Sequence, residues 1–142
     1  MTRPRRWLAA SLLGVVLPAC SSTTEPLSGL PVTLTERDFP TPPTGATAIV
    51  AFKDTVIAST VQQPACATNR ANAGIQGSRL VITLTLDESI PLRCALISGV
   101  VVYTLTVHGI PPGHYLADFE LLTVTTQPTT RTPISSAVVA LP

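Results

Sequence analysis

The stretch of residues 99–125 constrains the fold more than any other part of the chain, because two apolar runs flank a loop rich in glycine and proline. Apolar side chains occupy every second position on both sides of the loop: Val101, Tyr103, Leu105, Val107, Tyr115, Ala117, Phe119 and Leu121. Alternate side chains of a strand point to the same face of a sheet. Each run therefore predicts a strand with one buried face, and a shift of one residue would bury Asp118 and Glu120.

The spacing across the loop predicts a hairpin. Counting back from residues 109–113 places Val107 opposite Tyr115 and His108 opposite His114, so that one face is apolar and the other is mostly polar. Pro111 lies in the loop because proline lacks the N–H that a strand ladder needs. In this register the two histidines lie side by side at the rim of the loop.

The loop sequence GIPPGHY, residues 109–115, is also similar to two known kinds of β module. It resembles the strand–loop–strand corner of fibronectin type III and other immunoglobulin-like domains, and equally the GLPPGxY loop of transthyretin-like modules. The first resemblance implies a structural role for Tyr115, whose hydroxyl would hydrogen-bond back to the backbone. It also implies an alternative to the hairpin, in which the two runs lie in opposing sheets.

Four further segments read as strands, and no window outside the N-terminal leader has a helical period. The predicted strands are residues 46–52, 55–61, 79–86 and 134–141, of which the first two form one bent strand or two short ones. Residues 32–35 predict a short edge strand, whereas residues 62–78, 87–92 and 127–133 are rich in loop and turn residues. The sequence therefore predicts an all-β fold, a small antiparallel β-sandwich of about seven strands that is immunoglobulin-like or transthyretin-like.

The N-terminus has the pattern of an export signal. Three arginines, Arg3, Arg5 and Arg6, precede an apolar run at residues 7–17 that is too short to span a bilayer. General secretion is the expected route, and the paired arginines before Trp7 leave a twin-arginine route open.

Residues 17–20, Leu-Pro-Ala-Cys, resemble the lipobox of bacterial lipoproteins. The resemblance implies that residues 1–19 are removed as a signal peptide and that Cys20 is lipidated and anchors the protein to the membrane. Ser21 resembles the outer-membrane sorting signal of Gram-negative lipoproteins, which implies an outer-membrane location facing the periplasm or the cell surface. An ordinary cleaved signal peptide is the alternative.

The remaining chain divides into a tether and one small domain. Residues 20–45 are rich in Ser, Thr and Pro and predict a lipidated tether, and residues 46–142 predict the β-sandwich. Because three of the nine basic residues lie in the signal, six remain against eight acidic ones. This balance argues against a nucleic-acid partner.

Two cysteines remain after Cys20, and in an exported protein they predict a disulfide between Cys66 and Cys94. By closing this loop, the bond would restrict the unfolded chain and stabilise the fold by about 3–4 kcal/mol on the entropic interpretation. A redox or metal-binding role is the alternative, and no Cys-x-x-Cys spacing is present to support it.

His108 and His114 are the candidate functional residues, because two adjacent imidazoles can share a metal ion. The alternative is that both are ordinary solvated residues at a loop rim. The chain contains no nucleophile elbow, His-Glu-x-x-His motif or glycine-rich phosphate loop, and Asp118 and Glu120 fit a solvated strand face better than a catalytic pair. The sequence thus predicts a non-enzymatic, cofactor-free module that binds an envelope protein or a glycan, with a periplasmic metal or ligand carrier as the alternative.

Overall fold

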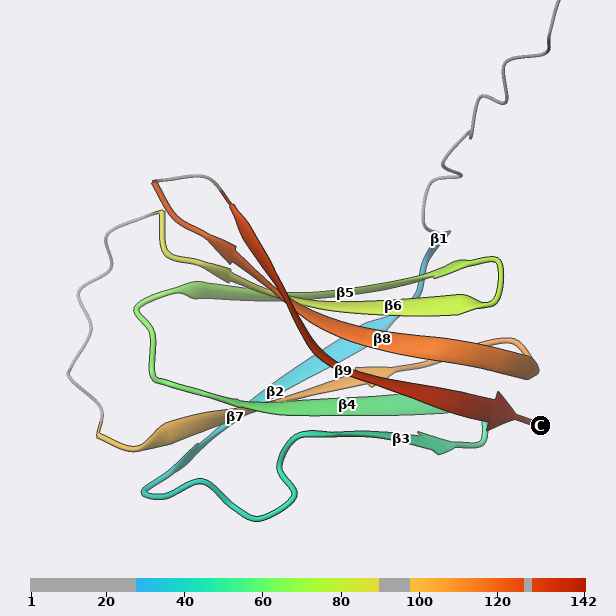
Figure 1. The fold of residues 1–142 in the computed structure, drawn as a ribbon, viewed down its shortest axis with the longest axis horizontal. Helices are drawn as coiled ribbons and strands as arrows, with labels where there is room; N and C mark the ends of the chain where they lie inside the picture. The colour runs from blue at the N-terminus through green and yellow to red at the C-terminus, as the bar shows by residue number, and fades with distance from the viewer. Residues whose placement is uncertain (1–27, 90–97, 127–128) are drawn as a thin grey trace, which may run out of the picture.

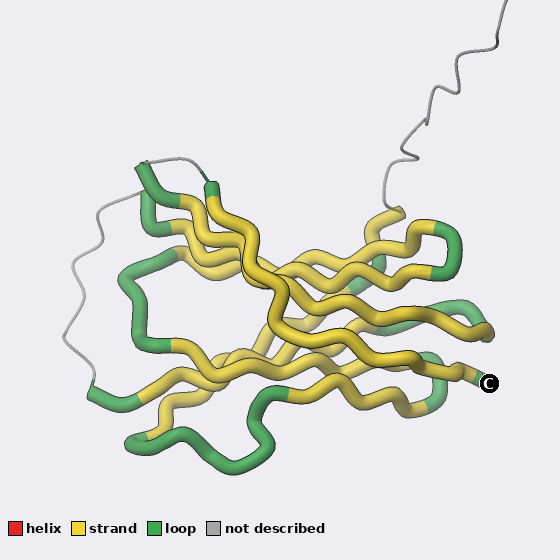
Figure 2. The backbone as a smooth tube through the Cα atoms, in the orientation of Figure 1, coloured by secondary structure: helices red, strands yellow, loops and turns green. Residues whose placement is uncertain are grey.

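The fold was analysed in a computed structural model that describes residues 28–89, 98–126 and 129–142. This part of the chain consists of strands and loops and contains no helix (Figure 2). Its nine strands are β1 (Ser28–Gly29), β2 (Val32–Phe39), β3 (Ala48–Phe52), β4 (Thr55–Gln62), β5 (Thr68–Gln76), β6 (Arg79–Asp87), β7 (Val100–Val107), β8 (Gly113–Val124) and β9 (Thr130–Leu141). Over these residues, no helix has the length and apolar character that crossing a bilayer requires.

The strands form two sheets that pack face to face as a β-sandwich (Figure 1). One sheet has the order β1-β5-β6-β8-β9, and the other has the order β2-β7-β4-β3. The sheets also meet at their sides, where β2 contacts β5 and β3 contacts β9. The predicted all-β sandwich is confirmed, with two strands more than expected, β1 and β5, and with one parallel pair, β6 and β8, in an otherwise antiparallel pattern.

The core lies between the sheets and is formed by alternate side chains of the central strands. On β6, Leu80, Ile82 and Leu84 are fully buried, as the alternation predicts. The inward residues of β7 and β8 are the same eight that the sequence places on one face, and all of them are buried. Burying each large apolar side chain contributes about 1.5–3 kcal/mol, so these two faces supply much of the stability.

The predicted hairpin between β7 and β8 is wrong. Val107 pairs with Val32 and Val56 in one sheet, whereas Tyr115 pairs with Val139 in the other. The alternative of two runs in opposing sheets is the observed arrangement. It buries the same side chains as the hairpin would, because both sheets turn their inner faces toward one core.

Tyr115 forms the predicted corner where the chain passes from one sheet to the other. Its hydroxyl donates a hydrogen bond to the Pro111 carbonyl oxygen at 3.0 Å, and its ring is buried. Gly109 in the same loop has a φ of 68°, in the left-handed region that glycine adopts without strain. The loop thus changes sheets within a few residues.

Three boundaries differ from the prediction. The segment predicted as a tether contains β1 and all of β2, which pairs with β7 over its whole length. The segment predicted as a polar loop contains β5, whose inward residues Ala71 and Ala73 are too small to give a clear apolar pattern. Residues 130–133, predicted as loop, begin β9 and reach Pro133 on the edge of the sheet, where proline is tolerated.

Residues 48–62 form two strands, which settles one open alternative. β3 and β4 pair as a hairpin in which Phe52 lies opposite Thr55. Lys53 in the turn has a φ of 55°. The two-residue turn at Lys53 and Asp54 accounts for the break in the apolar pattern that the sequence shows there.

Candidate functional site

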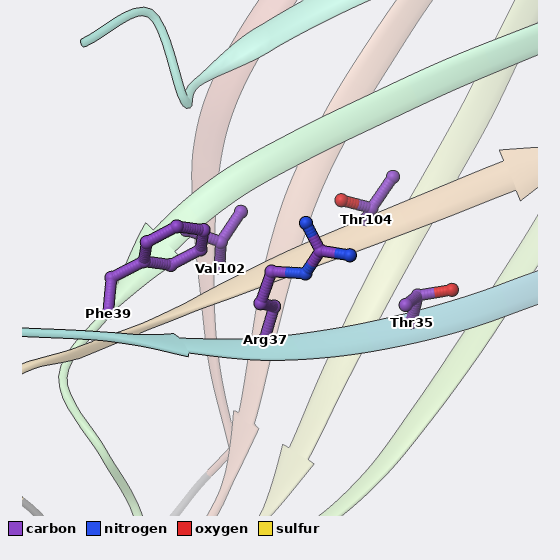
Figure 3. Close-up of a pocket in the computed structure, with 5 residues that line it drawn as sticks. All are labelled: Thr35, Arg37, Phe39, Val102 and Thr104. Atoms are coloured by element: carbon purple, nitrogen blue, oxygen red, sulfur yellow. The ribbon is translucent and has the colours of Figure 1, made fainter. Parts of the chain in front are cut away.

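The outer face of the four-stranded sheet carries a pocket between two neighbouring strands. Its volume is about 310 Å³, and its walls come from β2 and β7: Thr35, Arg37, Phe39, Val102 and Thr104 (Figure 3). The strand register sets this arrangement, because Thr35 is paired with Thr104 and Arg37 with Val102. All five side chains therefore project from the same face of the sheet.

Arg37 occupies the middle of the pocket. Figure 3 shows its guanidinium group between the Phe39 ring and Thr104. Arg70, Arg79 and Arg131 each form an ion pair with a carboxylate, whereas Arg37 has no ion pair within the described part of the chain. An exposed guanidinium with five donors and no acceptor among the residues that the structure describes is available to an anion from solution.

The surrounding outer face contains no acidic side chain. By the alternation of its strands, it is built from Thr33, Thr35, Arg37, Phe39, Ala48, Val50, Phe52, Thr55, Ile57, Ser59, Val61, Val100, Val102, Thr104 and Thr106. Val50 and Phe52 are 56% and 65% exposed. Within its strands, this face consists of hydroxyl and apolar groups and one charged side chain, Arg37, and at its far edge Lys53 Nζ of the β3–β4 turn lies 5.3 Å from the centre of the Phe52 ring.

Next to the pocket, the backbone of Gly99 lies close to the backbone carbonyl of Phe39. A Cβ atom on Gly99 would lie 2.3 Å from the Phe39 carbonyl oxygen, and Gly99 has a φ of +112°. Only glycine permits this approach, because any side chain would collide with the backbone of β2. Gly99 thus sets the end of β2 against the start of β7.

Behind the pocket, on the inner side of β2, a polar contact joins the two sheets. The Asn69 side-chain amide donates to the Glu36 carboxylate at 2.9 Å and to the Tyr103 hydroxyl at 3.4 Å. Burial of the Tyr103 side chain raises its pKa, and the negative charge of Glu36 raises it further, so the hydroxyl stays protonated. This contact ties β2 to β5 and steadies the strand that carries Arg37.

On the outer face of the five-stranded sheet, unlike that of the four-stranded sheet, the charged side chains are paired with one another. Asp118 accepts hydrogen bonds from Arg79 Nε at 2.9 Å, Arg79 Nη2 at 2.6 Å and Ser136 Oγ at 2.6 Å. Glu120 accepts from Thr83 Oγ1 at 3.0 Å and from Arg131. The Ser136 hydroxyl, and then Arg79, lower the pKa of Asp118.

Asp87 lies at the end of β6, on this same sheet. The side-chain and backbone donors of Ser89 lower its pKa, and Arg70 Nη2 lies 3.3 Å from its carboxylate. Asp87, Asp118 and Glu120 are therefore each held beside an arginine, and the prediction that Asp118 and Glu120 form a strand face agrees with their outward positions.

The predicted histidine rim does not have the register on which it was based. The backbone N–H of His108 donates to the Pro31 carbonyl oxygen at 3.0 Å, and His114 pairs with Ala140 on β8 and β9. Both side chains are exposed, and they border the loop that joins opposing sheets. Within the described residues, no group of three or more His, Cys, Asp or Glu side chains is placed to hold a metal ion.

The cysteine predictions extend beyond the described residues. Cys20 and Cys94 both lie outside them, so lipidation and the bridge to Cys66 stay predictions. Cys66 itself lies in the exposed loop between β4 and β5.

Sequence reasoning missed the pocket because it assigned Arg37 and Phe39 to the tether. The alternation of Val32 and Leu34 with threonines ends at residue 35, and the charged residues 36–38 that follow hide the rest of the strand. In comparisons with protein-family models, with curated proteins and with solved structures, no match to this chain was found. The chain thus belongs to the structural class of β-sandwiches, and its site is defined by its own residues.

Proposed function

We propose that this protein is a lipid-anchored, non-enzymatic binding module of the bacterial cell envelope. The observation that carries the proposal is the open pocket at β2 and β7, whose arginine forms no ion pair with any of the described residues. The lipobox at residues 17–20 supplies the location, through lipid on Cys20 at an outer membrane and facing the periplasm or the cell surface. The partner is an envelope protein or a glycan.

The position of the pocket suits a module held at a membrane. Cys20 precedes Ser28 by eight residues, a distance that spans at most roughly 29 Å of extended chain. β2 runs from Val32, near the end where β1 enters the sandwich, to Phe39 at the opposite end (Figure 1). The pocket is thus on the half of β2 that an anchor on Cys20 would hold away from the bilayer.

Binding, instead of catalysis, fits the charges of the described residues. A hydrolytic site needs carboxylates or imidazoles that are positioned at a cleft. Asp87, Asp118 and Glu120 are engaged with arginines on the outer side of the other sheet, and the pocket itself is lined by one cation, one aromatic ring and groups of low reactivity. These groups support binding of a ligand, and the five lining residues include no carboxylate or imidazole.

A disulfide between Cys66 and Cys94 is part of the proposal. Oxidation in the envelope and the presence of two cysteines after Cys20 support the bond. It would link the β4–β5 loop to the segment before β7. Peptide mapping with and without reductant tests it, and two free thiols in the mature protein would exclude it.

The alternative of a metal or ligand carrier based on His108 and His114 is not carried forward. It depended on the hairpin register that placed the two imidazoles side by side, and β7 and β8 pair with other strands instead.

Fatty-acid labelling in a bacterial host tests the anchor. We expect the wild-type protein to incorporate an alkyne fatty acid and to sediment with membranes, and Cys20→Ala to lose both properties. Ser21→Ala is the matched control and should keep the label, because it leaves the modified thiol intact. Equal labelling of Cys20→Ala, or an unlabelled wild-type protein, would contradict the proposal. Crosslinking in cells that carry wild type or Cys20→Ala then identifies partners that depend on the anchor.

A further inference from the structure

We infer that the pocket between β2 and β7 is a subsite for a carboxylate-bearing sugar ring, so that the module binds an acidic glycan through a uronate residue. The inference rests on the proposed binding function and specifies its ligand class. Four features of the outer face of the four-stranded sheet support it: the charge of Arg37, the ring of Phe39, the hydroxyl groups around them and the size of the pocket.

Arg37 supplies the recognition of the carboxylate. Guanidinium groups bind carboxylates with two parallel hydrogen bonds, and these charged bonds are stronger than neutral ones. No acidic side chain lines the pocket, so within the described residues nothing competes for the guanidinium group. By contrast, Arg79 reaches Asp118 at 2.6 Å and is already occupied.

Phe39 and Val102 supply an apolar wall for the ring itself. The Phe39 ring lies beside Val102 at one side of the guanidinium group (Figure 3). An aromatic ring has a negative face, which suits the C–H groups that a pyranose presents on one of its faces. A simple inorganic anion would leave this wall unused.

Hydroxyl side chains extend from the pocket across three strands. Thr35 is paired with Thr104, and Thr104 with Ser59. In the next outward row of the sheet Thr33 is paired with Thr106. Each hydroxyl both donates and accepts hydrogen bonds, as the hydroxyls of a sugar do, and in the described part of the chain none of these five forms a side-chain hydrogen bond with a protein group.

The pocket has room for one ring and is open along the sheet. Its volume of about 310 Å³ is at the lower end of ligand sites, which hold roughly 300–1,000 Å³. A single uronate residue fits this volume, and its neighbours in a chain would lie over the row of hydroxyls. The hydroxyl rows favour a glycan over the carboxyl terminus of a peptide, which would need apolar side-chain pockets.

Titration with trigalacturonate, compared with its neutral methyl ester, tests the inference. The mature lipoprotein in detergent micelles is used, and binding is measured by calorimetry. We expect the acid to bind at least about tenfold more tightly than the ester, which is the effect of one charged hydrogen-bonding pair. Arg37→Gln should lose about tenfold or more, and Phe39→Ala should weaken binding of both the acid and the ester.

Arg70→Gln is the matched control, because it removes an exposed arginine from the outer face of the other sheet. It should leave trigalacturonate binding unchanged, and the thermal unfolding of Arg37→Gln should match that of the wild type. Equal affinity for acid and ester, or equal losses in Arg37→Gln and Arg70→Gln, would overturn the inference. So would acetate that binds as tightly as the sugar, or a peptide with an aromatic carboxyl terminus that binds more tightly.

The outcome is independent of the anchor. Binding is measured on purified protein, whereas the anchor is measured by fatty-acid labelling in cells. If the protein incorporates the fatty acid but does not bind trigalacturonate, only this inference is overturned. If it binds trigalacturonate but does not incorporate the fatty acid, only the proposed location is overturned.

Discussion

The two outer faces of the sandwich use charge in opposite ways. On the five-stranded sheet, Asp118 and Glu120 lie next to arginines, and each carboxylate has more than one donor. On the four-stranded sheet, Arg37 has no ion pair within the described residues, and Phe52 and Val50 project into solvent. Groups that satisfy one another stabilise the protein, whereas groups that remain unpaired are available to a ligand. The first face is therefore structural, and the second is the one that we propose as the binding surface.

The largest test of this comparison concerns two phenylalanines. If the outer face of the four-stranded sheet is free surface, Phe52→Ala should change the free energy of unfolding by no more than about 0.5 kcal/mol, because Phe52 is 65% exposed. Phe119→Ala should cost about 3–5 kcal/mol, because Phe119 is 1% exposed and its removal leaves a cavity. Urea unfolding monitored by circular dichroism measures both values. A loss above about 2 kcal/mol for Phe52→Ala would show that this face is packed against another part of the protein or a second copy.

A second test concerns the contact that holds Phe39. Gly99→Ala combines a left-handed backbone with a collision at the Phe39 carbonyl, and should cost roughly 2–4 kcal/mol. Gly109→Ala is the matched control: its φ is +68° but nothing lies near the added Cβ, so about 1 kcal/mol is expected. Thermal unfolding compares the two variants. Equal destabilisation would mean that backbone conformation alone accounts for Gly99 and that β2 is free to move.

The smallest effect is the pH dependence of the structural face. The folded pKa of Asp118 is lowered from its ordinary value of 3.8 by Ser136 and Arg79, so its contribution to stability is complete above that value. The contribution is lost as the pH falls through the lower, folded pKa. Asp118→Asn should reduce the unfolding free energy at neutral pH by about 1 kcal/mol and flatten its fall below about pH 4.

Arg37→Gln is the control for this pH series. It removes a charge from the binding face without removing an ion pair, and its profile of unfolding free energy against pH should follow that of the wild type. Urea unfolding from about pH 2 to pH 7 distinguishes the two variants. A profile for Asp118→Asn that runs parallel to the wild type would contradict the role assigned to its carboxylate.

Much of the fold was predictable because every second residue of a strand with one buried face is apolar. The inward faces of β6, β7 and β8 were predicted correctly, and so was the corner at Tyr115. β5 was missed because its inward alanines resemble a loop composition, and β2 was cut short at residue 35 because charged residues follow. Strand pairing itself overrides such weak local signals.

The pocket was not predictable from the same pattern. Arg37 and Thr104 are 67 residues apart in the chain. They become neighbours only because β2 pairs with β7, and no local pattern at either position indicates the other. The proximity of His108 and His114 was derived from a strand pairing that does not form, so the observed register does not support it.

The sequence by itself determined the all-β class, the identity of the inward side chains and the prediction of an anchor at Cys20. These depend on local composition and on a two-residue period, which one chain displays in full. The tertiary structure decided which strands are neighbours, because the hydrogen bonds between strands use backbone groups that nearly all residues share. A hairpin of β7 and β8 would bury the same side chains as the observed arrangement in two sheets. The packing of the whole domain therefore decides between the two arrangements. That choice paired β7 with β2 and β4 instead of β8, and it placed Val102 and Thr104 beside Arg37 and Thr35 on an open face.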